Sequence, residues 1–560
     1  MSNNVQNSDH YSHDYSWSER VCSPITTLSE AWTCLENLPR WINNIIELIP
    51  RSSMAIKCTD LECHVENDKF GPIIRTHHNS VPRTLICHDM KGGYIQDKFT
   101  GPVLEGNGYA FYRWAQIDSF VYFSHHLITI PPLGWINVAH RNGVKILGTF
   151  ITEWDSGKFI CEEILKSPEA IKKFANILAD LCVTYKIDGW LLNIENSISN
   201  PLKLIDFVEY LTRLLHIRRP GSLIIWYDSV TKDGKLSWQN ELNDFNRSFF
   251  DVCDGIFVNY TWNETNLQQT VKEAKHRNLD VYIGVDVFGR NFFGGGHFNT
   301  YLAAEKIRQY NLSMAIFAQG WTHETLEKEP RETFMERFLD RDNAFWRSLW
   351  PYLYTHLPTL TFHTTFYCGS DKEYYRLNSQ ELQLTRFLHG KGKSREDFEV
   401  ATLIDTCNCL QMHFDGKYTS CVISRGHLDG HNYVHHLFSC DIHVNGDAII
   451  YTYTKPHNDA FDNLSIVLLI QNSSGSYEKI VCHSVDQVKL QNSVTLTEIN
   501  ETNSEEVINK IAIAHHYYPK EWRLRCFEVH LYDCKIIEIG AKIEKGNSVC
   551  LCGFGIADMS

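Results

Sequence analysis

The sequence predicts a (β/α)8 barrel followed by antiparallel β-structure. Eight short apolar runs rich in β-branched residues alternate with longer segments over about 250 residues, and several of these segments have apolar positions at helical spacing. After about Trp350 the alternation of strand and helix ends, and short runs separated by Gly, Asn and Asp follow one another. The first pattern is typical of parallel strands with crossover helices, and the second is typical of a β-sandwich.

The eight apolar runs are the expected parallel strands of the barrel. Helical patterns separate them: residues 168–185 place Ile171 and Phe174 on one face of a helix, and residues 202–216 and 267–277 are similar. The regularity of the alternation, more than any single run, predicts the barrel. In chain order the expected strands are residues 84–87, 120–125, 144–151, 189–195, 223–229, 255–262, 281–288 and 314–321.

Three regions are expected along the chain. Residues 1–69 form a polar tail with short helices near Ala31 and over residues 41–48, residues 70–355 form the catalytic barrel, and residues 356–560 form a β-sandwich region of one or two modules. We expect this last region to brace the barrel, with a carbohydrate-binding module as the alternative. Its expected strands are residues 418–424, 448–453, 465–471, 477–484, 523–531 and 535–543.

The charge pattern excludes two classes of partner. The 560-residue chain has a formal net charge of −14 and its Lys and Arg residues form no run, so we expect neither nucleic acid nor an anionic membrane as a partner. No apolar run is long enough to span a bilayer. The polar N-terminus lacks the basic head and apolar stretch of a secretory leader, which predicts a cytosolic protein.

The 18 cysteines are expected to be reduced structural thiols, because nothing predicts export to an oxidising compartment. Two close cysteine pairs, 407/409 and 550/552, have no second pair at zinc-ribbon spacing. The His pairs 435–436 and 515–516 each offer one ligand at most, since neighbours on a strand face opposite ways. We therefore expect no metal and no cofactor.

The fourth expected strand ends in two polar groups, Asn193 and Glu195. Side chains alternate along a strand, so these two share a face, while Leu192 and Ile194 face the helices. Catalytic groups of (β/α)8 barrels lie at the carboxyl ends of the strands. A polar cluster that merely closes the top of the barrel is the alternative, but the position favours catalysis. We expect Glu195 to be the proton donor.

A carboxylate with an amide two residues before it suits one kind of glycoside hydrolysis. Most glycosidases place two carboxylates at the bond, but a sugar with a 2-acetamido group can supply its own nucleophile. The acetamide oxygen attacks the anomeric carbon, an acid protonates the leaving oxygen, and attack by water then gives net retention. In this chemistry Glu195 is the acid and base, Asn193 orients the acetamide, and Tyr227 on the next strand binds the acetamide oxygen.

Aromatic, amide and acidic groups recur at the other strand ends. Each Trp alone is more often a core residue, but the repetition at equivalent positions favours a groove for carbohydrate, whose apolar faces stack on aromatic rings. The expected substrate-binding residues are Tyr94, Glu153, Trp154, Trp226, Asn259, Trp262, Asp286 and Trp321.

Five motifs together resemble glycoside hydrolase family 85. The resemblance runs from about Gly71 through the barrel and continues more weakly into residues 522–531. Any one motif is weak, whereas five in the same order on the expected strands are specific. The motifs are residues 88–94 (HDMKGGY), 147–154 (LGTFITEW), 188–196 (DGWLLNIEN), 226–229 (WYDS) and 257–262 (FVNYTW).

This family contains the cytosolic endo-β-N-acetylglucosaminidases. The resemblance implies a mannosyl-glycoprotein endo-β-N-acetylglucosaminidase that cleaves the GlcNAc-β1,4-GlcNAc bond in the chitobiose core of N-linked glycans, on free oligosaccharides, glycopeptides or glycoproteins. It places the oxazoline-orienting Asn at Asn193, the general acid/base at Glu195 and the active-site Tyr at Tyr227. The sugar-groove positions that it implies are Trp226, Asn259, Trp262 and Trp321.

The sequence departs from the family pattern at two places. Gln319 stands where Pro is expected, and residues 291–293 (NFF) precede the glycine run after the seventh strand. Both departures bear on glycan preference, and neither touches the predicted catalytic pair. Two other functions stay open: a catalytically silent glycan-binding protein on the same barrel, and a chitinase-like or two-carboxylate glycosidase in which Asp228 or Glu153 supplies the second carboxylate.

Overall fold

The computed structural model describes most of the barrel and parts of the regions around it. The disordered tail expected over residues 1–20, the helix expected over residues 41–48, the strand expected over residues 418–424 and the 515–516 His pair lie outside the described residues. The described residues are 21–38, 51, 54–56, 81–98, 109–111, 113–326, 328–354, 356–358, 362–364, 399–402, 408–413, 434–456, 464–482, 488–489, 495–499, 523–542 and 548–558.

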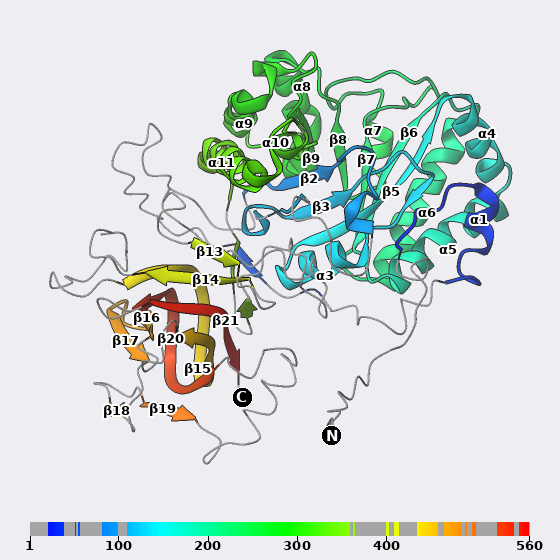
Figure 1. Cartoon of the computed structure of the whole chain (residues 1–560). Coiled ribbons are helices and arrows are strands. Elements are labelled where there is room, and N and C mark those ends of the chain that lie inside the picture. The colour runs from blue at the N-terminus through cyan, green and yellow to red at the C-terminus, as the bar shows by residue number, and fades with distance from the viewer. Residues whose placement is uncertain are drawn as a thin grey trace, which may run out of the picture.

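The eight predicted strands are confirmed, and they close into a parallel barrel (Figure 1). The barrel strands are β2 (Thr84–His88), β3 (Ser119–Tyr122), β5 (Lys145–Glu153), β6 (Gly189–Glu195), β7 (Leu223–Tyr227), β8 (Gly255–Val258), β9 (Val281–Asp286) and β10 (Ser313–Phe317). Each pairs with the next, and β10 pairs with β2 to close the ring. The short β4 (Ile128–Thr129) adds to β5 in the antiparallel sense.

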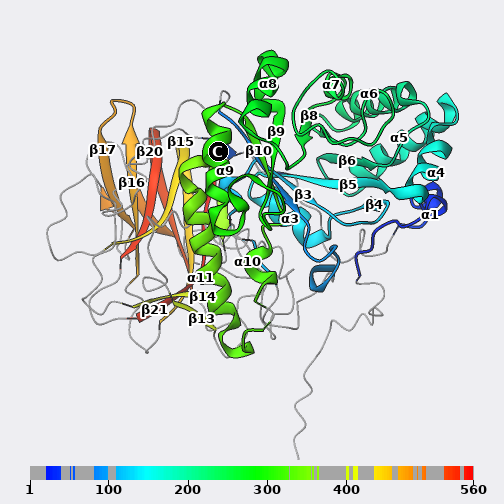
Figure 2. The ribbon, with the colours of Figure 1, turned by 90° about the horizontal axis from the view of Figure 1, so that it is seen from above.

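Helices cover the outside of this ring (Figure 2). The three predicted crossover helices are confirmed, and Ser167 caps the second of the helices between β5 and β6 by accepting the amide of Ala170, with Pro168 in the first turn. The α-helices are α1 (Leu28–Thr33), α3 (Leu133–Arg141), α4 (Trp154–Leu165), α5 (Pro168–Thr184), α6 (Pro201–Arg218), α7 (Arg247–Phe250), α8 (Glu264–Ala274), α9 (Thr300–Gln309), α10 (Trp321–Glu324) and α11 (Arg331–Leu349). Short 3-10 turns are η3 (Gln96–Lys98), η4 (Trp114–Gln116), η5 (Lys275–Asp280), η6 (Phe293–Gly295), η7 (His297–Asn299) and η8 (Trp350–Tyr352).

Each barrel strand divides its side chains between two cores. One set faces inward and fills the barrel, including Leu191 and Ile225, while the other packs between the strands and the helices, including Leu192 and Ile194. This division follows from the alternation of side chains along a strand. Because Leu191 faces inward, the odd-numbered residues that follow it on β6 face inward as well, which is the orientation predicted for the polar end of this strand.

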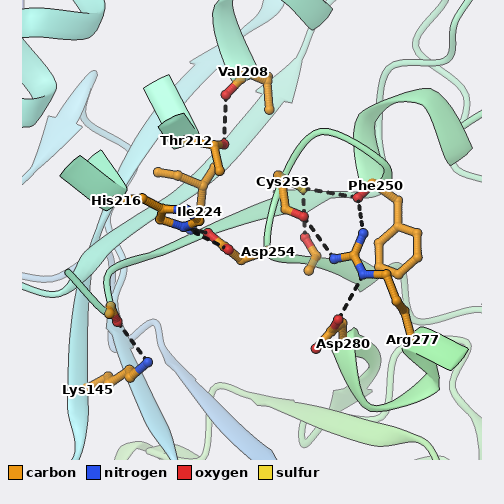
Figure 3. A network of polar contacts seen from close by, with 12 residues as sticks. Lys145, Val208, Thr212, His216, Ile224, Phe250, Cys253, Asp254, Arg277 and Asp280 are labelled. Carbon is orange, nitrogen blue, oxygen red and sulfur yellow. Dashed lines mark hydrogen bonds and ion pairs between the residues drawn. The ribbon is translucent and has the colours of Figure 1, made fainter. Parts of the chain in front are cut away.

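Ion pairs and hydrogen bonds fix the amino-terminal ends of the strands, at the end of the barrel opposite the predicted site. Asp254, just before β8, accepts the amide of Ile224 in β7 at 2.7 Å and binds His216 of α6 at 2.9 Å (Figure 3). Arg277, in the turn before β9, donates to Asp280 and to the carbonyls of Phe250 and Cys253, at and after the end of α7. This end of a (β/α)8 barrel contributes to stability rather than to chemistry.

The same arrangement recurs at two other strand pairs. Asp118, just before β3, accepts the amide of Thr84 in β2 at 2.7 Å. Asp188, just before β6, accepts the amide of Ile146 in β5 at 3.0 Å. In each case an aspartate that precedes one strand satisfies a backbone donor at the start of the preceding barrel strand, which fixes the relative height of the two strands.

The C-terminal region forms an antiparallel sheet of ten strands, so the predicted fold class is confirmed (Figure 1). The two strands expected over residues 523–531 and 535–543 are one continuous strand, which pairs along most of its length with another long strand through several register shifts. Such shifts are β-bulges, at which a strand bends. The strands are β12 (Phe362–Thr364), β13 (Glu399–Thr402), β14 (Asn408–His413), β15 (Val434–Pro456), β16 (Ser465–Asn472), β17 (Tyr477–Cys482), β18 (Val488–Lys489), β19 (Thr495–Ile499), β20 (Arg523–Lys542) and β21 (Ser548–Asp558).

A two-stranded sheet joins the segments that precede and follow the barrel. Strand β1 (Met54–Ile56) pairs in the antiparallel sense with β11 (His356–Pro358). Among the helices that the structure describes, none combines the length and the apolar character that a membrane crossing requires.

Candidate active site

Polar and acidic side chains gather at the carboxyl ends of neighbouring barrel strands. Glu153 ends β5, Glu195 ends β6, Tyr227 ends β7 and Asp286 ends β9, while Asn259 directly follows β8. Strands β5 and β6 pair so that Glu153 lies beside Glu195. The structure therefore brings five of the predicted site residues to one end of the barrel.

Glu195 is partly buried and is held by a tryptophan from the loop after β7. The indole Nε1 of Trp238 donates to Oε1 of Glu195 at 3.3 Å. Burial raises the pKa of Glu195 and the charge of Glu153 raises it further, whereas hydrogen bonds from Trp238 and Asn193 lower it. The net shift is upward, which favours the protonated carboxyl that a proton donor needs near neutral pH.

Asn193 is almost fully buried, with 4% of its surface exposed, and it lies two residues before Glu195 on the same face of β6. Its hydrogen bond to the Glu195 side chain is one of the influences that lower the pKa of that carboxyl. A buried amide with both a donor and an acceptor beside the predicted acid is suited to orienting a second amide.

Tyr227 and Asn259 form a hydrogen-bonded pair that continues into the β7 loop. The hydroxyl of Tyr227 donates to Oδ1 of Asn259 at 2.7 Å, and Nδ2 of Asn259 donates to Oδ1 of Asn240 at 2.7 Å. Burial raises the pKa of Tyr227 well above its usual value, so the phenol keeps its proton. The chain of contacts fixes the phenol on the inward face of the barrel, one strand away from Glu195.

Asp228 holds the loop that carries Trp238. This buried carboxylate accepts the amides of Gln239 and Asn240 and the side-chain amide of Asn246. Burial raises the pKa of Asp228 to about 6, although the loop donors oppose this. Its oxygens are therefore occupied by the protein's own donors, which makes it an anchor for the loop rather than a free carboxylate in the barrel mouth.

Glu153 and Trp154 lie at the start of α4, on the far side of Glu195 from Trp238. Both carboxylate oxygens of Glu153 are within 3.3 Å of Nδ1 of His125. Trp154 is 80% exposed and has a backbone φ of 58°, a left-handed conformation that is uncommon for a bulky residue. A strained, exposed indole directly after an inward carboxylate is a candidate sugar platform.

Asp286 and Tyr94 are placed among loop contacts. Asp286 accepts the amides of Phe288 and Arg290 and binds the guanidinium of Arg290 through Nε at 2.9 Å. The hydroxyl of Tyr94 donates to the carbonyl of Ile130 at 2.7 Å. These two side chains fasten the loops after β9 and β2, so any contact with a sugar comes in addition to a structural role.

Three of the predicted groove tryptophans are not brought to the barrel mouth. Trp226 is fully buried on the outward face of β7, where it stacks on Phe249 at 4.1 Å between ring centroids. Trp262 is buried and donates Nε1 to the carbonyl of Gly284. Trp321 is buried between His297 and Arg341. The expected aromatic rim is thus corrected: the exposed indoles among the described residues are Trp154 and Trp238.

Sequence reasoning missed Trp238, Asn240 and His125. Trp238 and Asn240 lie in the loop after β7, where strand patterns give no signal, and only the anchoring by Asp228 brings them to the site. His125 lies beyond the end of β3, within the run expected as a strand. The departure at Gln319 is explained locally: Nε2 donates to Nδ1 of the buried His88, whose pKa burial lowers to about 3.

The described residues show no cluster of three or more His, Cys, Asp or Glu side chains that could hold a metal ion. The cysteines described with their surroundings, such as Cys87 and Cys253, are free thiols that are mostly buried. Burial raises the pKa of Cys253 to about 12, so this thiol stays protonated at neutral pH.

The chain is similar to a solved glycoside hydrolase structure over almost its whole length. That structure is the crystal structure of the glycoside hydrolase domain of Endo-D from Streptococcus pneumoniae R6, with a TM-score of 0.64 and 15% identity over 96% of this chain and 84% of that chain. At this identity the likeness shows the fold, including a β-region beside a barrel.

Curated relatives are similar in sequence over half of the chain or more. A protein of Arabidopsis thaliana described as cytosolic endo-beta-N-acetylglucosaminidase 2 is 37% identical over 448 residues, 74% of this chain and 62% of that protein. A human protein described as cytosolic endo-beta-N-acetylglucosaminidase is 46% identical over 318 residues, 54% of this chain and 42% of that protein. The chain thus spans roughly half of the length of the relatives that it matches.

A family match covers more than half of the chain. Residues 94–395 match the family described as glycosyl hydrolase family 85, and this range contains the ends of β5 to β10 and thus Glu195 with its surroundings. The motifs noted in the sequence lie at the carboxyl ends of predicted strands or directly after them. Fold, motif order and family match agree, and the chain belongs to glycosyl hydrolase family 85.

Proposed function

We propose that this protein is an endo-β-N-acetylglucosaminidase that hydrolyses the GlcNAc-β1,4-GlcNAc bond in the chitobiose core of N-glycans. The observation that carries the proposal is the pair formed by Asn193 and Glu195 on the inward face of β6, with the pKa of Glu195 raised by burial. Relatives described as cytosolic endo-beta-N-acetylglucosaminidases support the substrate class and a cytosolic location. Free oligosaccharides, glycopeptides and glycoproteins with this core are the proposed substrates.

The first step uses the substrate's own acetamide as the nucleophile. Glu195 gives its proton to the leaving glycosidic oxygen while the 2-acetamido oxygen attacks the anomeric carbon, which forms an oxazolinium ion that keeps the acetamide N–H and inverts that centre. Asn193 orients the acetamide, and the phenol of Tyr227 hydrogen-bonds the acetamide oxygen. In the structure this hydroxyl donates to Oδ1 of Asn259, so binding of the acetamide oxygen requires its single proton to turn from Asn259 to the sugar.

The second step restores the configuration. Glu195, now ionised, takes a proton from water, which attacks the anomeric carbon and opens the oxazolinium ring to release the neutral acetamide with net retention. The hydrogen bond from Trp238 stabilises the carboxylate form of Glu195 in this step, whereas burial favours the acid form needed in the first step. These opposing influences on its pKa allow the Glu195 carboxyl to act as an acid in the first step and as a base in the second.

Exposed groups around Glu195 are the proposed sugar contacts. Trp154, directly after β5, and Trp238, in the loop after β7, have exposed indoles that can stack on the apolar faces of sugar rings. Asn259 and Asp286 offer polar atoms at the same end of the barrel.

Glycan release from a high-mannose glycopeptide tests the proposal. The wild-type chain is expected to leave one GlcNAc on the peptide and to release a glycan one GlcNAc shorter, both visible by mass spectrometry. Glu195→Gln should reduce the rate by about 10²- to 10⁴-fold, the usual contribution of a general acid. Glu163→Gln on the outer helix α4, where Glu163 pairs with Lys166, is the matched control and should retain the wild-type rate.

Two outcomes of this assay decide between the proposal and its alternatives. Tight glycan binding without release by the wild-type chain would identify a silent glycan-binding protein. Cleavage of a substrate that lacks the 2-acetamido group would identify a two-carboxylate glycosidase. The anchoring of Asp228 by its own loop speaks against that residue as the second carboxylate.

A further inference from the structure

Two carboxylates lie at the same height on neighbouring strands of the barrel. Glu153 and Glu195 are register partners at the ends of β5 and β6, and paired strands lie about 4.8 Å apart. Both side chains face the barrel interior, because Glu153 lies two residues after the inward-facing Ile151 and Glu195 lies four residues after the inward-facing Leu191. The acetamide-assisted route proposed above uses one of these carboxylates and gives the other no role.

The carboxylate of Glu153 is paired with a histidine and not with a permanent cation. Its oxygens lie 3.2 and 3.3 Å from Nδ1 of His125. Among the described residues, no Lys or Arg forms a hydrogen bond or an ion pair with this carboxylate. The His125 side chain is 57% exposed, so it can exchange protons with solvent. The hydrogen bond to Glu153 raises the pKa of His125.

The other charges at this end of the barrel have partners of their own. Asp286 binds Arg290, and Asp228 is occupied by the loop after β7. Asp89 accepts the amide of Gly92, and burial raises its pKa. The titratable groups that act on Glu195 or His125 across the barrel mouth are Asp89, His125, Glu153, Glu195, Tyr227 and Tyr260. Of these, Glu153 is the one carboxylate that adds to burial in opposing the ionisation of Glu195.

We propose that Glu153 is a positioning residue that keeps Glu195 in its acid form, and that His125 adjusts this action by gaining or losing a proton. A negative neighbour makes ionisation of Glu195 less favourable, and a protonated His125 cancels much of that negative charge. The proposal deepens the proposed function, on which its kinetic test rests. It gives Glu153 an electrostatic role in place of the sugar contact that the sequence suggested.

The arrangement extends catalysis toward higher pH. As the pH rises, His125 loses its proton and uncovers the charge of Glu153, which opposes the ionisation of Glu195. Because Glu195 must be protonated for the first step, activity falls as the pH rises through its pKa. Uncovering Glu153 moves that fall to higher pH.

The pH dependence of kcat tests this role in four proteins. Compared with wild type, Glu153→Gln should move the alkaline limb of the profile to lower pH by about one unit, with little change at acidic pH. His125→Gln should leave the alkaline limb of the profile in place. Because this variant lacks the positive charge that offsets Glu153, the pKa of Glu195 should be raised already at the lower pH values where His125 is protonated in wild type. The double variant should match Glu153→Gln, because His125 acts through Glu153. Glu163→Gln controls for the loss of a distant negative charge.

Direct titration of Glu195 separates this inference from the proposed function. The protein is labelled with 13C at the glutamate carboxyl carbons, and the Glu195 signal is assigned by its loss in Glu195→Gln. The midpoint should fall in Glu153→Gln even if the chain releases no glycan from any substrate. An unchanged midpoint, an equal loss of kcat at every pH, or a rise in KM alone would overturn the proposal and leave Glu153 as a structural residue or a sugar ligand.

Discussion

Glu195 receives opposing influences from three directions. Burial and the neighbouring charge of Glu153 favour its acid form, whereas the indole of Trp238 and the amide of Asn193 favour the carboxylate. A residue that must give up a proton and then take one back needs such a balance. The chemistry of this carboxyl therefore depends on two strands and one loop, and a change in any of them shifts the balance in a foreseeable direction.

Replacement of Asn193 gives the sharpest prediction at this scale. Asn193→Ala removes the amide that we propose orients the acetamide, so kcat should fall by about 10²- to 10³-fold, as when an oriented hydrogen-bond donor is lost from an active site. KM should change far less, because the contact matters most in the transition state.

Steady-state kinetics on a defined glycopeptide measures this split. Asn176→Ala on the outer helix α5, where the side chain donates to the carbonyl of Lys172, is the matched control for loss of an amide. Normal turnover by Asn193→Ala would rule out the acetamide-assisted mechanism.

The loop between β7 and α7 is the element that completes the site. Its position depends on Asp228, whose buried carboxylate accepts hydrogen bonds from the middle of the loop and from its α7 end, and accepts the amide of Asn259 as well. Asn240, with a φ of 58°, then joins the loop to Asn259 and Thr261. Trp238 reaches Glu195 because this network holds the loop against the barrel.

Asp228→Ala should therefore reduce activity without removing any group that touches the substrate. Release of the loop displaces Trp238, and kcat/KM should fall by roughly 10- to 100-fold, the cost of a misplacement of about 1 Å. The pKa of Glu195 should rise, since it loses the indole donor. Kinetics and the pH profile measure both effects.

A control in the same loop makes this prediction specific. Asp244 is exposed and pairs with Lys232, so Asp244→Ala should keep wild-type activity. An Asp228→Ala variant with unchanged kcat/KM would show that the loop is held by its other contacts.

The strands could be predicted from sequence, whereas the loops and the facing of several side chains could not. Alternating apolar runs locate all eight barrel strands, and the polar end of β6 is correctly oriented. Trp226 and Tyr227 are adjacent, so only one of them can face inward. Side chains alternate along β7, and the inward-facing Ile225 is followed two residues later by Tyr227, so Tyr227 faces inward and Trp226 outward. The position of Trp238 depends on contacts between residues far apart in the sequence, which no local pattern encodes.

The two ends of the barrel divide stability and chemistry across the whole molecule. The carboxyl ends of the strands carry the predicted catalytic groups, and the amino ends carry aspartates that satisfy backbone amides. Each end can therefore be altered without changing the other, as is usual in (β/α)8 barrels.

Asp254→Ala tests this division. Loss of the contacts with the Ile224 amide and His216 should lower the free energy of unfolding by about 1–3 kcal/mol, since a backbone donor is left without its partner. The melting temperature should fall by a few degrees, while kcat and KM at 25 °C stay at their wild-type values. Thermal unfolding and kinetics on the same preparation provide the measurement, and a drop in kcat would show that the two ends are coupled.

The aspartates Asp118, Asp188 and Asp254 have a further consequence for how the barrel opens. Each ties its own strand to the strand before it, so β2 is joined to β3, β5 to β6 and β7 to β8. Joined strands should separate from the barrel together, as cooperative units of local opening. Amide protons at the starts of two joined strands should then exchange with solvent at similar rates, and the seams between units, such as that between β6 and β7, should be where the ring first parts.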